Sequence, residues 1–113
     1  ASPESVIQNS LISEGCNIEG HIDFSVLFAG VTIEPGAVVR DSIIMPNTTI
    51  KKGAVVEYAI VGEDCVIGEN VKVGARPESI EDKDTWGVAV IGHGVTVSDN
   101  AEIKPKAMIS ADV

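Results

Sequence analysis

Residues 31–74 read VTIEPGAVVRDSIIMPNTTIKKGAVVEYAIVGEDCVIGENVKVG, and their apolar residues recur at one long spacing. Ile33, Ile50 and Ile67 follow one another at intervals of 17 residues. Two further sets keep the same interval: Val39, Val56 and Val73, and also Leu27, Ile44 and Val61. A shared long period predicts a repeat architecture in which each turn of the chain stacks on the turn before it. An ordinary β-sandwich gives no reason for three sets to share one period.

The positions around these apolar residues predict short strands that are separated by corners. A small residue often stands two positions earlier, as Ala54 does before Val56, and residues two apart on a strand face the same side. Three residues after many of the apolar positions comes a residue that tolerates positive φ, which a tight corner requires. These expected corner residues are Gly15, Gly36, Asn47, Gly53, Asp64, Asn70, Gly94 and Asn100. The pattern predicts an all-β fold, a parallel β-helix with single-stranded triangular coils of hexapeptide repeats.

The same rhythm divides the chain into segments. Residues 6–74 are expected to form β-helix coils, residues 75–87 to leave the β-helix as a loop, and residues 88–113 to form a final coil. The loop is charged and contains the single tryptophan, Trp86. We expect either a solvated loop or one in which Trp86 anchors a neighbouring molecule. Residues 1–5 are expected to be a linker or vector-derived residues.

Composition excludes several classes of function. The chain has 113 residues and a formal charge of -9, which fits a single small domain. Eight Lys and Arg residues against 17 Asp and Glu residues cannot supply a surface for nucleic acid or for an anionic membrane. No apolar run approaches the roughly 20 residues that span a bilayer. Two cysteines are too few for a disulfide framework and fit a cytoplasmic location.

Few residues in the sequence could carry catalytic chemistry. His21 and His93, the only histidines, are expected at corners, where a histidine can be a solvated residue or the general base of an acyltransferase. Cys16 and Cys65 are expected to be small buried residues. These four residues form no recognised metal-binding spacing, and two histidines cannot build the three-histidine zinc site of a γ-type carbonic anhydrase. We therefore expect no catalytic, cofactor-binding or metal-binding residue in this chain.

Four basic residues are weak candidates for contacts with a phosphorylated effector. They are Lys51, Lys52, Lys72 and Arg76, which form local basic spots on an acidic chain. The alternative is that the lysines are ordinary solvated residues. The sequence does not identify the effector.

Three segments follow one another in a distinctive order: Asn9-Ser-Leu-Ile-Ser-Glu-Gly-Cys16, Ser25-Val-Leu-Phe28 and Asp41-Ser-Ile-Ile-Met-Pro-Asn47. Together they resemble the start of the C-terminal β-helix of bacterial glucose-1-phosphate adenylyltransferase (ADP-glucose pyrophosphorylase). The resemblance extends from about Ser5 to Ile109, and the closing hexads resemble clostridial or bacillus-type members. It implies left-handed coils, whereas the general chirality of crossovers would favour right-handed ones.

This resemblance also implies a function. Members of the family make ADP-glucose and pyrophosphate from ATP and glucose 1-phosphate with Mg²⁺, for glycogen biosynthesis. In that family the chemistry belongs to an N-terminal nucleotidyltransferase domain, whose glycine-rich loop and metal-binding aspartates have no counterpart in this chain. The chain is then expected to be the regulatory and oligomerisation domain, non-catalytic by itself, within a homotetramer under allosteric control by sugar phosphates. A hexapeptide-repeat acyltransferase and the β-helix of a non-catalytic paralogous subunit remain alternatives.

Overall fold

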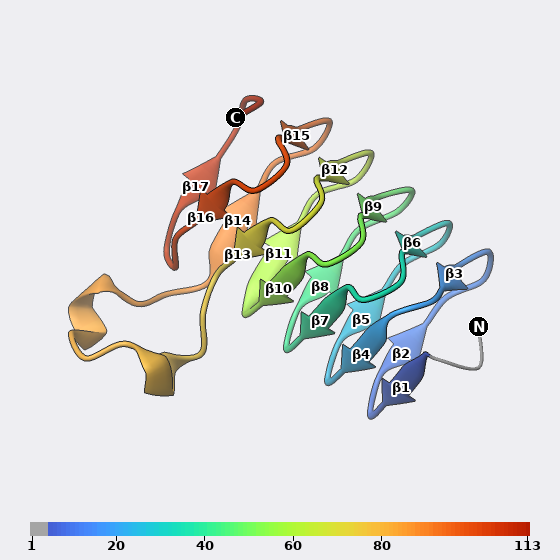
Figure 1. The fold of residues 1–113 in the computed structure, drawn as a ribbon, viewed down its shortest axis with the longest axis horizontal. Helices are drawn as coiled ribbons and strands as arrows, with labels where there is room; N and C mark the ends of the chain where they lie inside the picture. The colour runs from blue at the N-terminus through green and yellow to red at the C-terminus, as the bar shows by residue number, and fades with distance from the viewer. Residues whose placement is uncertain (1–4) are drawn as a thin grey trace.

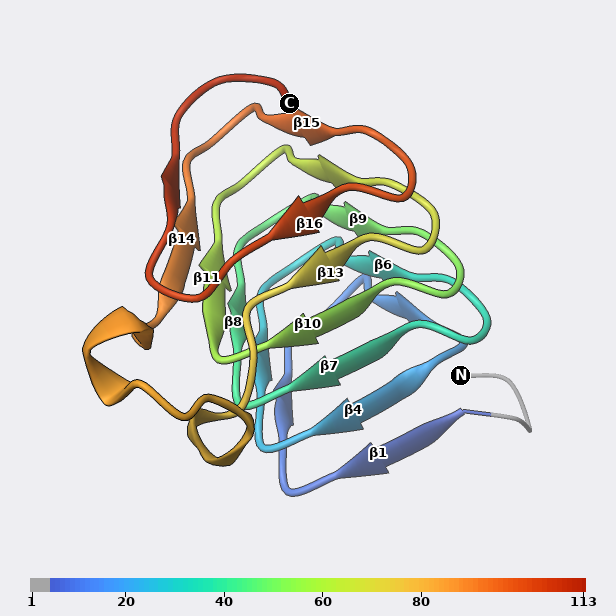
Figure 2. The same ribbon diagram turned by 60° about the vertical axis from the view of Figure 1, so that its left-hand side comes forward.

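The chain winds into a three-sided prism whose sides are three parallel sheets, as the computed structural model of residues 5–113 shows (Figures 1 and 2). Sheet A contains β1 (Val6–Gln8), β4 (His21–Asp23), β7 (Val38–Arg40), β10 (Val55–Glu57), β13 (Lys72–Val73) and β16 (Glu102–Ile103). Sheet B contains β2 (Leu11–Ile12), β5 (Val26–Leu27), β8 (Ile43–Ile44), β11 (Ala59–Val61), β14 (Ala89–Ile91) and β17 (Met108–Ile109). Sheet C contains β3 (Asn17–Ile18), β6 (Thr32–Ile33), β9 (Thr49–Ile50), β12 (Val66–Ile67) and β15 (Thr96–Val97).

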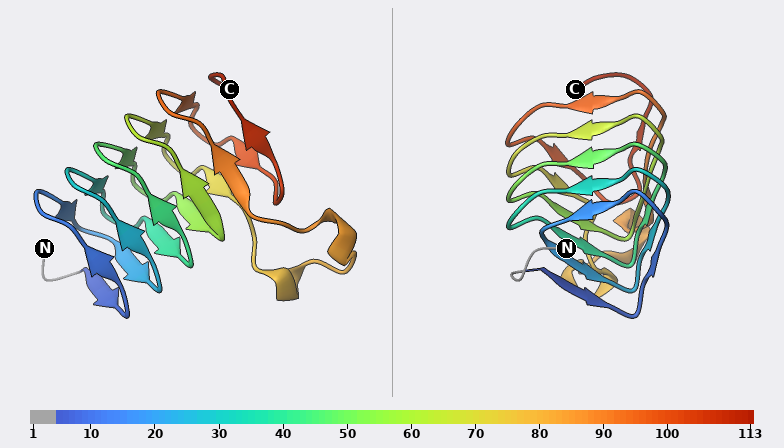
Figure 3. Two further views of the ribbon diagram at one scale, coloured as in Figure 1. Left: turned by 180° about the vertical axis from the view of Figure 1, so that it is seen from behind. Right: turned by 90° about the vertical axis from the view of Figure 1, so that its right-hand side faces the viewer.

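The coils are left-handed. The right panel of Figure 3 views the prism from its N-terminal end, and the chain runs counter-clockwise as it recedes from the viewer. Each strand inside a sheet pairs with the equivalent strands of the coils before and after it, and the strands at the two ends pair on one side. The predicted left-handed parallel β-helix is therefore confirmed, and the handedness is the one that the family resemblance implied.

The interior is built from the predicted apolar sets. Ile33 pairs with Ile50, and Ile50 pairs with Ile67, so the three side chains are stacked directly above one another. All three are fully buried, as is Ala54. Burying aliphatic side chains in this way supplies the main favourable free energy of the fold, about 1.5–3 kcal/mol for each fully buried side chain.

The eight predicted corner residues all have positive φ, between 56° for Asp64 and 77° for Gly36. The corners between sheets A and B turn on other residues, including Asn9, Phe24, Asp41 and Tyr58. Asn and Asp tolerate positive φ, but aromatic residues rarely adopt it, so the conformation of Phe24 and Tyr58 could not be predicted from residue type.

Serine hydroxyls support the corners between sheets A and B. The Ser42 hydroxyl donates to the Arg40 carbonyl oxygen at 2.7 Å and accepts from the Ala59 amide at 3.2 Å. Ser25 repeats this arrangement one coil earlier, where its hydroxyl donates to the Asp23 carbonyl and accepts from the Ser42 amide. Each hydroxyl thus satisfies a backbone donor that the turn leaves without a strand partner.

One segment departs from the coils. The chain leaves sheet A after β13 and returns at β14, and between them lie two short 3-10 turns, η1 (Pro77–Ser79) and η2 (Lys83–Thr85). Figures 1 and 2 show this segment projecting from the corner between sheets A and B. We call residues 75–87 the excursion. Of the predicted linker residues 1–5, residues 1–4 lie outside the described residues. No helix within residues 5–113 is long and apolar enough to cross a membrane.

Candidate functional site

The four basic candidates come from three parts of the prism. Lys51 and Lys52 lie at the corner between β9 and β10, and Lys72 lies on the exposed side of sheet A in β13. Arg76 begins the excursion, where its guanidinium forms an ion pair with Glu57. The three lysines therefore remain candidates for contact with an anion, whereas the charge of Arg76 is already opposed by a carboxylate.

The two histidines lie on different sides of the prism. His93 is exposed at a corner after β14, as predicted. His21 is exposed but is the first residue of strand β4, so the prediction of a corner position was wrong. The corner before β4 is shorter than the later ones, because Ile18 and Ile22 are only four residues apart whereas Ile33 and Val39 are six apart. No group of three or more metal-binding side chains occurs within residues 5–113.

Both cysteine thiols donate hydrogen bonds to backbone carbonyl oxygens of the next coil. The Cys65 thiol is buried and donates to the Gly92 carbonyl oxygen at 3.0 Å, and burial raises the pKa of this thiol. The Cys16 thiol is half-buried and donates to the Phe28 carbonyl oxygen at 3.1 Å. The buried position expected for Cys65 is confirmed, whereas Cys16 is only partly buried and packs against the core from its margin.

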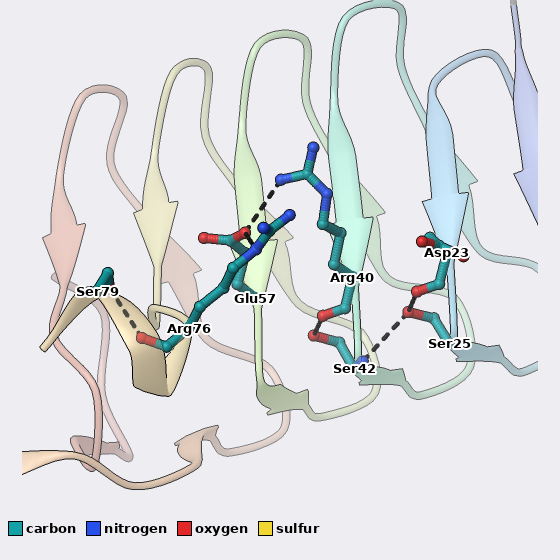
Figure 4. A network of polar contacts seen from close by, with 7 residues as sticks. All are labelled: Asp23, Ser25, Arg40, Ser42, Glu57, Arg76 and Ser79. Atoms are coloured by element: carbon teal, nitrogen blue, oxygen red, sulfur yellow. Dashed lines mark hydrogen bonds and ion pairs between the residues drawn. The ribbon is translucent and has the colours of Figure 1, made fainter. Parts of the chain in front are cut away.

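A carboxylate at the end of strand β10 holds the excursion (Figure 4). Glu57 Oε2 accepts from Arg40 Nη1 at 3.0 Å and from Arg76 Nε at 3.2 Å, and the Glu57 side chain is only 11% exposed. Arg40 and Glu57 are neighbours in the register of β7 and β10. Removing a partner from such a pair leaves a poorly hydrated charge, so the contact fixes the start of the excursion against the coils.

Asp23 lies one coil before this pair. It is the register neighbour of Arg40 on the opposite side from Glu57, and its Oδ1 atom is buried without a hydrogen-bond partner among residues 5–113. Arg40 thus stands between two carboxylates and contacts one of them (Figure 4). A shallow pocket of about 140 Å³ adjoins these residues, with Gln8 and His21 in its lining.

Trp86 fixes the other end of the excursion. Its indole Nε1 donates to the Ala75 carbonyl oxygen at 2.7 Å, and its ring meets the Tyr58 ring edge-on with centroids 5.5 Å apart. Burial and the nearby Asp41 carboxylate raise the pKa of Tyr58. Within this chain, therefore, Trp86 packs against its own coil.

The substitution Trp86→Ala should release the excursion and leave the coils intact. An edge-on aromatic pair contributes about 0.5–1.5 kcal/mol and a buried hydrogen bond about 1 kcal/mol, so we expect local opening to rise roughly thirtyfold. Cleavage by trypsin after Lys83 measures this opening, while far-UV circular dichroism monitors the coils. The exposed neighbour substitution Glu81→Ala should leave the cleavage rate unchanged, and equal rates for both variants would contradict this role of Trp86.

A larger groove separates the excursion from the last coil. Its volume is about 770 Å³, and its lining includes Ile80, Thr85, Lys104 and Pro105. Lys106 also lines it, and its Nζ atom donates to the Asp84 carbonyl oxygen at 3.0 Å. Sequence reasoning missed this groove because the repeat does not determine the path of the excursion.

The outer face of sheet B is apolar along the whole prism. The outward-facing residue of each of its six strands is aliphatic or methionine. These residues, which we call the sheet B face, are Leu11, Val26, Ile43, Ile60, Val90 and Met108. The left panel of Figure 3 looks onto this side of the molecule. Period 17 alone could have identified the stripe, because Val26, Ile43 and Ile60 keep that interval.

Comparison with known proteins places this chain among its relatives. The family model for the GlmU-like C-terminal hexapeptide region matches residues 1–98. Glucose-1-phosphate adenylyltransferases of Bacillus anthracis, Bacillus mycoides (strain KBAB4) and Bacillus cereus (strain Q1) are each 49% identical to it over 88 residues. That match covers 78% of this chain and 22% of each relative. The chain therefore spans less than a quarter of the length of those enzymes.

Two solved structures share the fold. The acetyltransferase domain of PglB from Neisseria gonorrhoeae FA1090 superposes with a TM-score of 0.71 at 21% identity, over 98% of this chain and 48% of that chain. WeeI from Acinetobacter baumannii AYE gives 0.56 at 18% identity, over 99% of this chain and 52% of that chain. Similarity at this level of identity concerns the fold alone. The left-handed coils, the hexad rhythm and the match over residues 1–98 together show that the chain belongs to the GlmU-like C-terminal hexapeptide family.

Proposed function

We propose that this chain is the C-terminal regulatory and oligomerisation domain of a glucose-1-phosphate adenylyltransferase. The observation that carries the proposal is the 49% identity over 88 residues with Bacillus enzymes of that name. In the complete protein an N-terminal nucleotidyltransferase domain would bind ATP, glucose 1-phosphate and Mg²⁺. It would release ADP-glucose and pyrophosphate in the cytoplasm for glycogen biosynthesis, and four such subunits would form a homotetramer.

The geometry supports a mechanical role for this domain. Each strand bonds to its equivalents above and below, so the prism is a continuous ladder of parallel strands with a close-packed interior. A stiff element of this kind can position a second domain and hold subunits at a fixed distance. A sugar-phosphate effector would act by binding one arrangement of domains better than another, with Lys51, Lys52 and Lys72 as the candidate contacts.

The first test concerns catalysis by the chain alone. Incubated with ATP, glucose 1-phosphate and Mg²⁺, the 113-residue chain should release no pyrophosphate, because the residues proposed to perform the reaction belong to the other domain. A coupled pyrophosphate assay measures this, and turnover by the chain would contradict the proposal. Calorimetry with acetyl-coenzyme A provides the matched test of the acyltransferase alternative, for which we expect no heat of binding.

The second test examines the polypeptide encoded directly before Ala1. We expect a nucleotidyltransferase domain with a glycine-rich loop and metal-binding aspartates. A different domain at that place would overturn the proposal. The same domain without its loop and aspartates would identify the non-catalytic paralogue in place of the active enzyme.

A further inference from the structure

The outer face of sheet A carries a column of polar side chains at the last position of its first four strands. Gln8, Asp23, Arg40 and Glu57 are consecutive neighbours in the register of β1, β4, β7 and β10. Each of them follows an inward position, such as that of the fully buried Val39, so the column faces outward. Successive members lie about 4.8 Å apart, which allows opposite charges to pair along the column.

The charges of this column are paired unevenly. Glu57 accepts from both Arg40 and Arg76, so one carboxylate opposes two guanidinium groups. Figure 4 shows the Arg40 side chain leaning toward Glu57, and on its other side the buried Oδ1 atom of Asp23 receives no hydrogen bond from residues 5–113. A buried carboxylate oxygen without a donor is unfavourable. The four groups carry no net charge together, yet Asp23 lacks a donor and Arg40 shares its only carboxylate.

Asp23 and Arg40 both line the pocket of about 140 Å³ on this face. Gln8 and His21 add polar groups to the lining, and Val38 adds apolar surface. A guanidinium has five N–H donors, and the ion pair of Arg40 uses only the one at Nη1. Since a water molecule takes about 30 Å³ of liquid, the pocket has room for a molecule of about five to seven non-hydrogen atoms.

The neutrality of the charged cluster decides which class of ligand suits the pocket. A simple cation would give Asp23 a donor, but it would add an unopposed positive charge beside Arg40. A simple anion would give Arg40 a second acceptor, but it would lie beside Asp23. A zwitterion provides an ammonium donor and a carboxylate acceptor at once and leaves the net charge unchanged, and both of its hydrogen bonds would be charge-assisted.

We infer that this pocket on sheet A binds a small zwitterion of the α-amino acid class. The ammonium group donates to Asp23, the carboxylate accepts from the remaining N–H donors of Arg40 and from the Gln8 amide, and a small apolar side chain lies toward Val6 and Val38. The inference goes beyond the proposed function, because neither catalysis by another domain nor oligomerisation uses this pocket. It can therefore fail while the assignment to an adenylyltransferase stands, and the reverse also holds.

An NMR titration of the 113-residue chain with L-alanine tests the inference directly. The amide signals of Ile22, Asp23 and Arg40 should shift and saturate with a Kd on the order of 10 mM, the weak affinity expected of a ligand with six non-hydrogen atoms. Amides of sheet C, such as those of Thr32 and Thr49, should not move. A titration without saturable shifts up to about 200 mM would show that the pocket takes only water and would overturn the inference.

Two half-ligands test the requirement for both charges. Ethylammonium is L-alanine without its carboxylate, and propionate is L-alanine without its ammonium group. Each should bind at least about tenfold more weakly than L-alanine when all samples contain the same salt concentration, because each leaves one of the two charged hydrogen bonds unmade. If either half-ligand binds as tightly as L-alanine, the pocket is a simple cation or anion site and the inference is wrong.

Two substitutions test the residues themselves. Asp23→Asn and Arg40→Gln each remove one charge from the pocket lining and should raise the Kd for L-alanine at least about tenfold. Asp41→Asn is the matched control, because it removes an exposed carboxylate that lies outside the pocket lining and should leave the Kd within about twofold. Unchanged sheet C amide signals in each variant show that the coils are intact. Equal Kd values for Asp23→Asn and Asp41→Asn would contradict the assigned site.

Discussion

Gly74→Ala should destabilise the chain by about 4 kcal/mol. Gly74 has a φ of +70°, and a Cβ atom built there would lie 2.0 Å from the Glu57 carbonyl oxygen. The positive φ alone costs an alanine about 1–2 kcal/mol, and the clash with backbone of the previous coil adds to this because the ladder cannot yield locally. Urea denaturation, followed by circular dichroism, measures the loss.

The matched control for this prediction is Gly36→Ala. Gly36 has a φ of +77°, but a Cβ there would meet only the Gly53 amide nitrogen at 3.7 Å, an ordinary contact. We expect a loss of about 1–2 kcal/mol from the backbone conformation alone. If both variants lose the same stability, the close approach of Gly74 to Glu57 contributes nothing and the reasoning fails.

Ile50→Ala should cost about 3–4 kcal/mol, the second of the two largest effects. Ile50 is fully buried in sheet C between Ile33 and Ile67, and the backbone ladders on both sides hold its neighbours in place. The surrounding side chains therefore cannot collapse into the cavity, which keeps the cost near the upper part of the usual range.

The adjacent substitution Lys51→Ala provides the control for the core variant. Lys51 is half-buried. Its backbone amide donates to the Ile67 carbonyl oxygen and its carbonyl oxygen accepts from the Ala54 amide, and the substitution retains both hydrogen bonds. We expect a change within about 0.5 kcal/mol, as for most surface substitutions. A urea midpoint for Ile50→Ala close to that of Lys51→Ala would show that the stacked column is not the main source of stability.

The repeating part of this fold could be predicted from the sequence because each coil imposes the same demands. Ile33, Ile50 and Ile67 share one inward position, and the corner residues share one backbone conformation. Positive φ at Phe24 and Tyr58 could not be predicted, because their side chains give no preference for it. There the strand register of neighbouring coils imposes the conformation on whichever residue occupies the corner.

Some contacts of the candidate site could likewise be predicted from the sequence, and others could not. Arg40 and Glu57 are 17 residues apart, so the period could have paired them. Arg76 reaches the same carboxylate from outside the repeat, and Trp86 reaches Tyr58 across 28 residues of sequence, so no period relates them. Contacts of this kind depend on the path of the excursion, which the repeat does not determine.

The excursion enters and leaves the prism without shifting a strand. Ala59 pairs with Ala89, and Val61 pairs with Ile91, as if the intervening residues were a single corner. The length of the inserted segment is therefore independent of the stacking of the coils. Foreign peptides could be grafted between Pro77 and Thr85 and displayed from a rigid support, and natural sequences could lengthen or shorten this segment without cost to the scaffold.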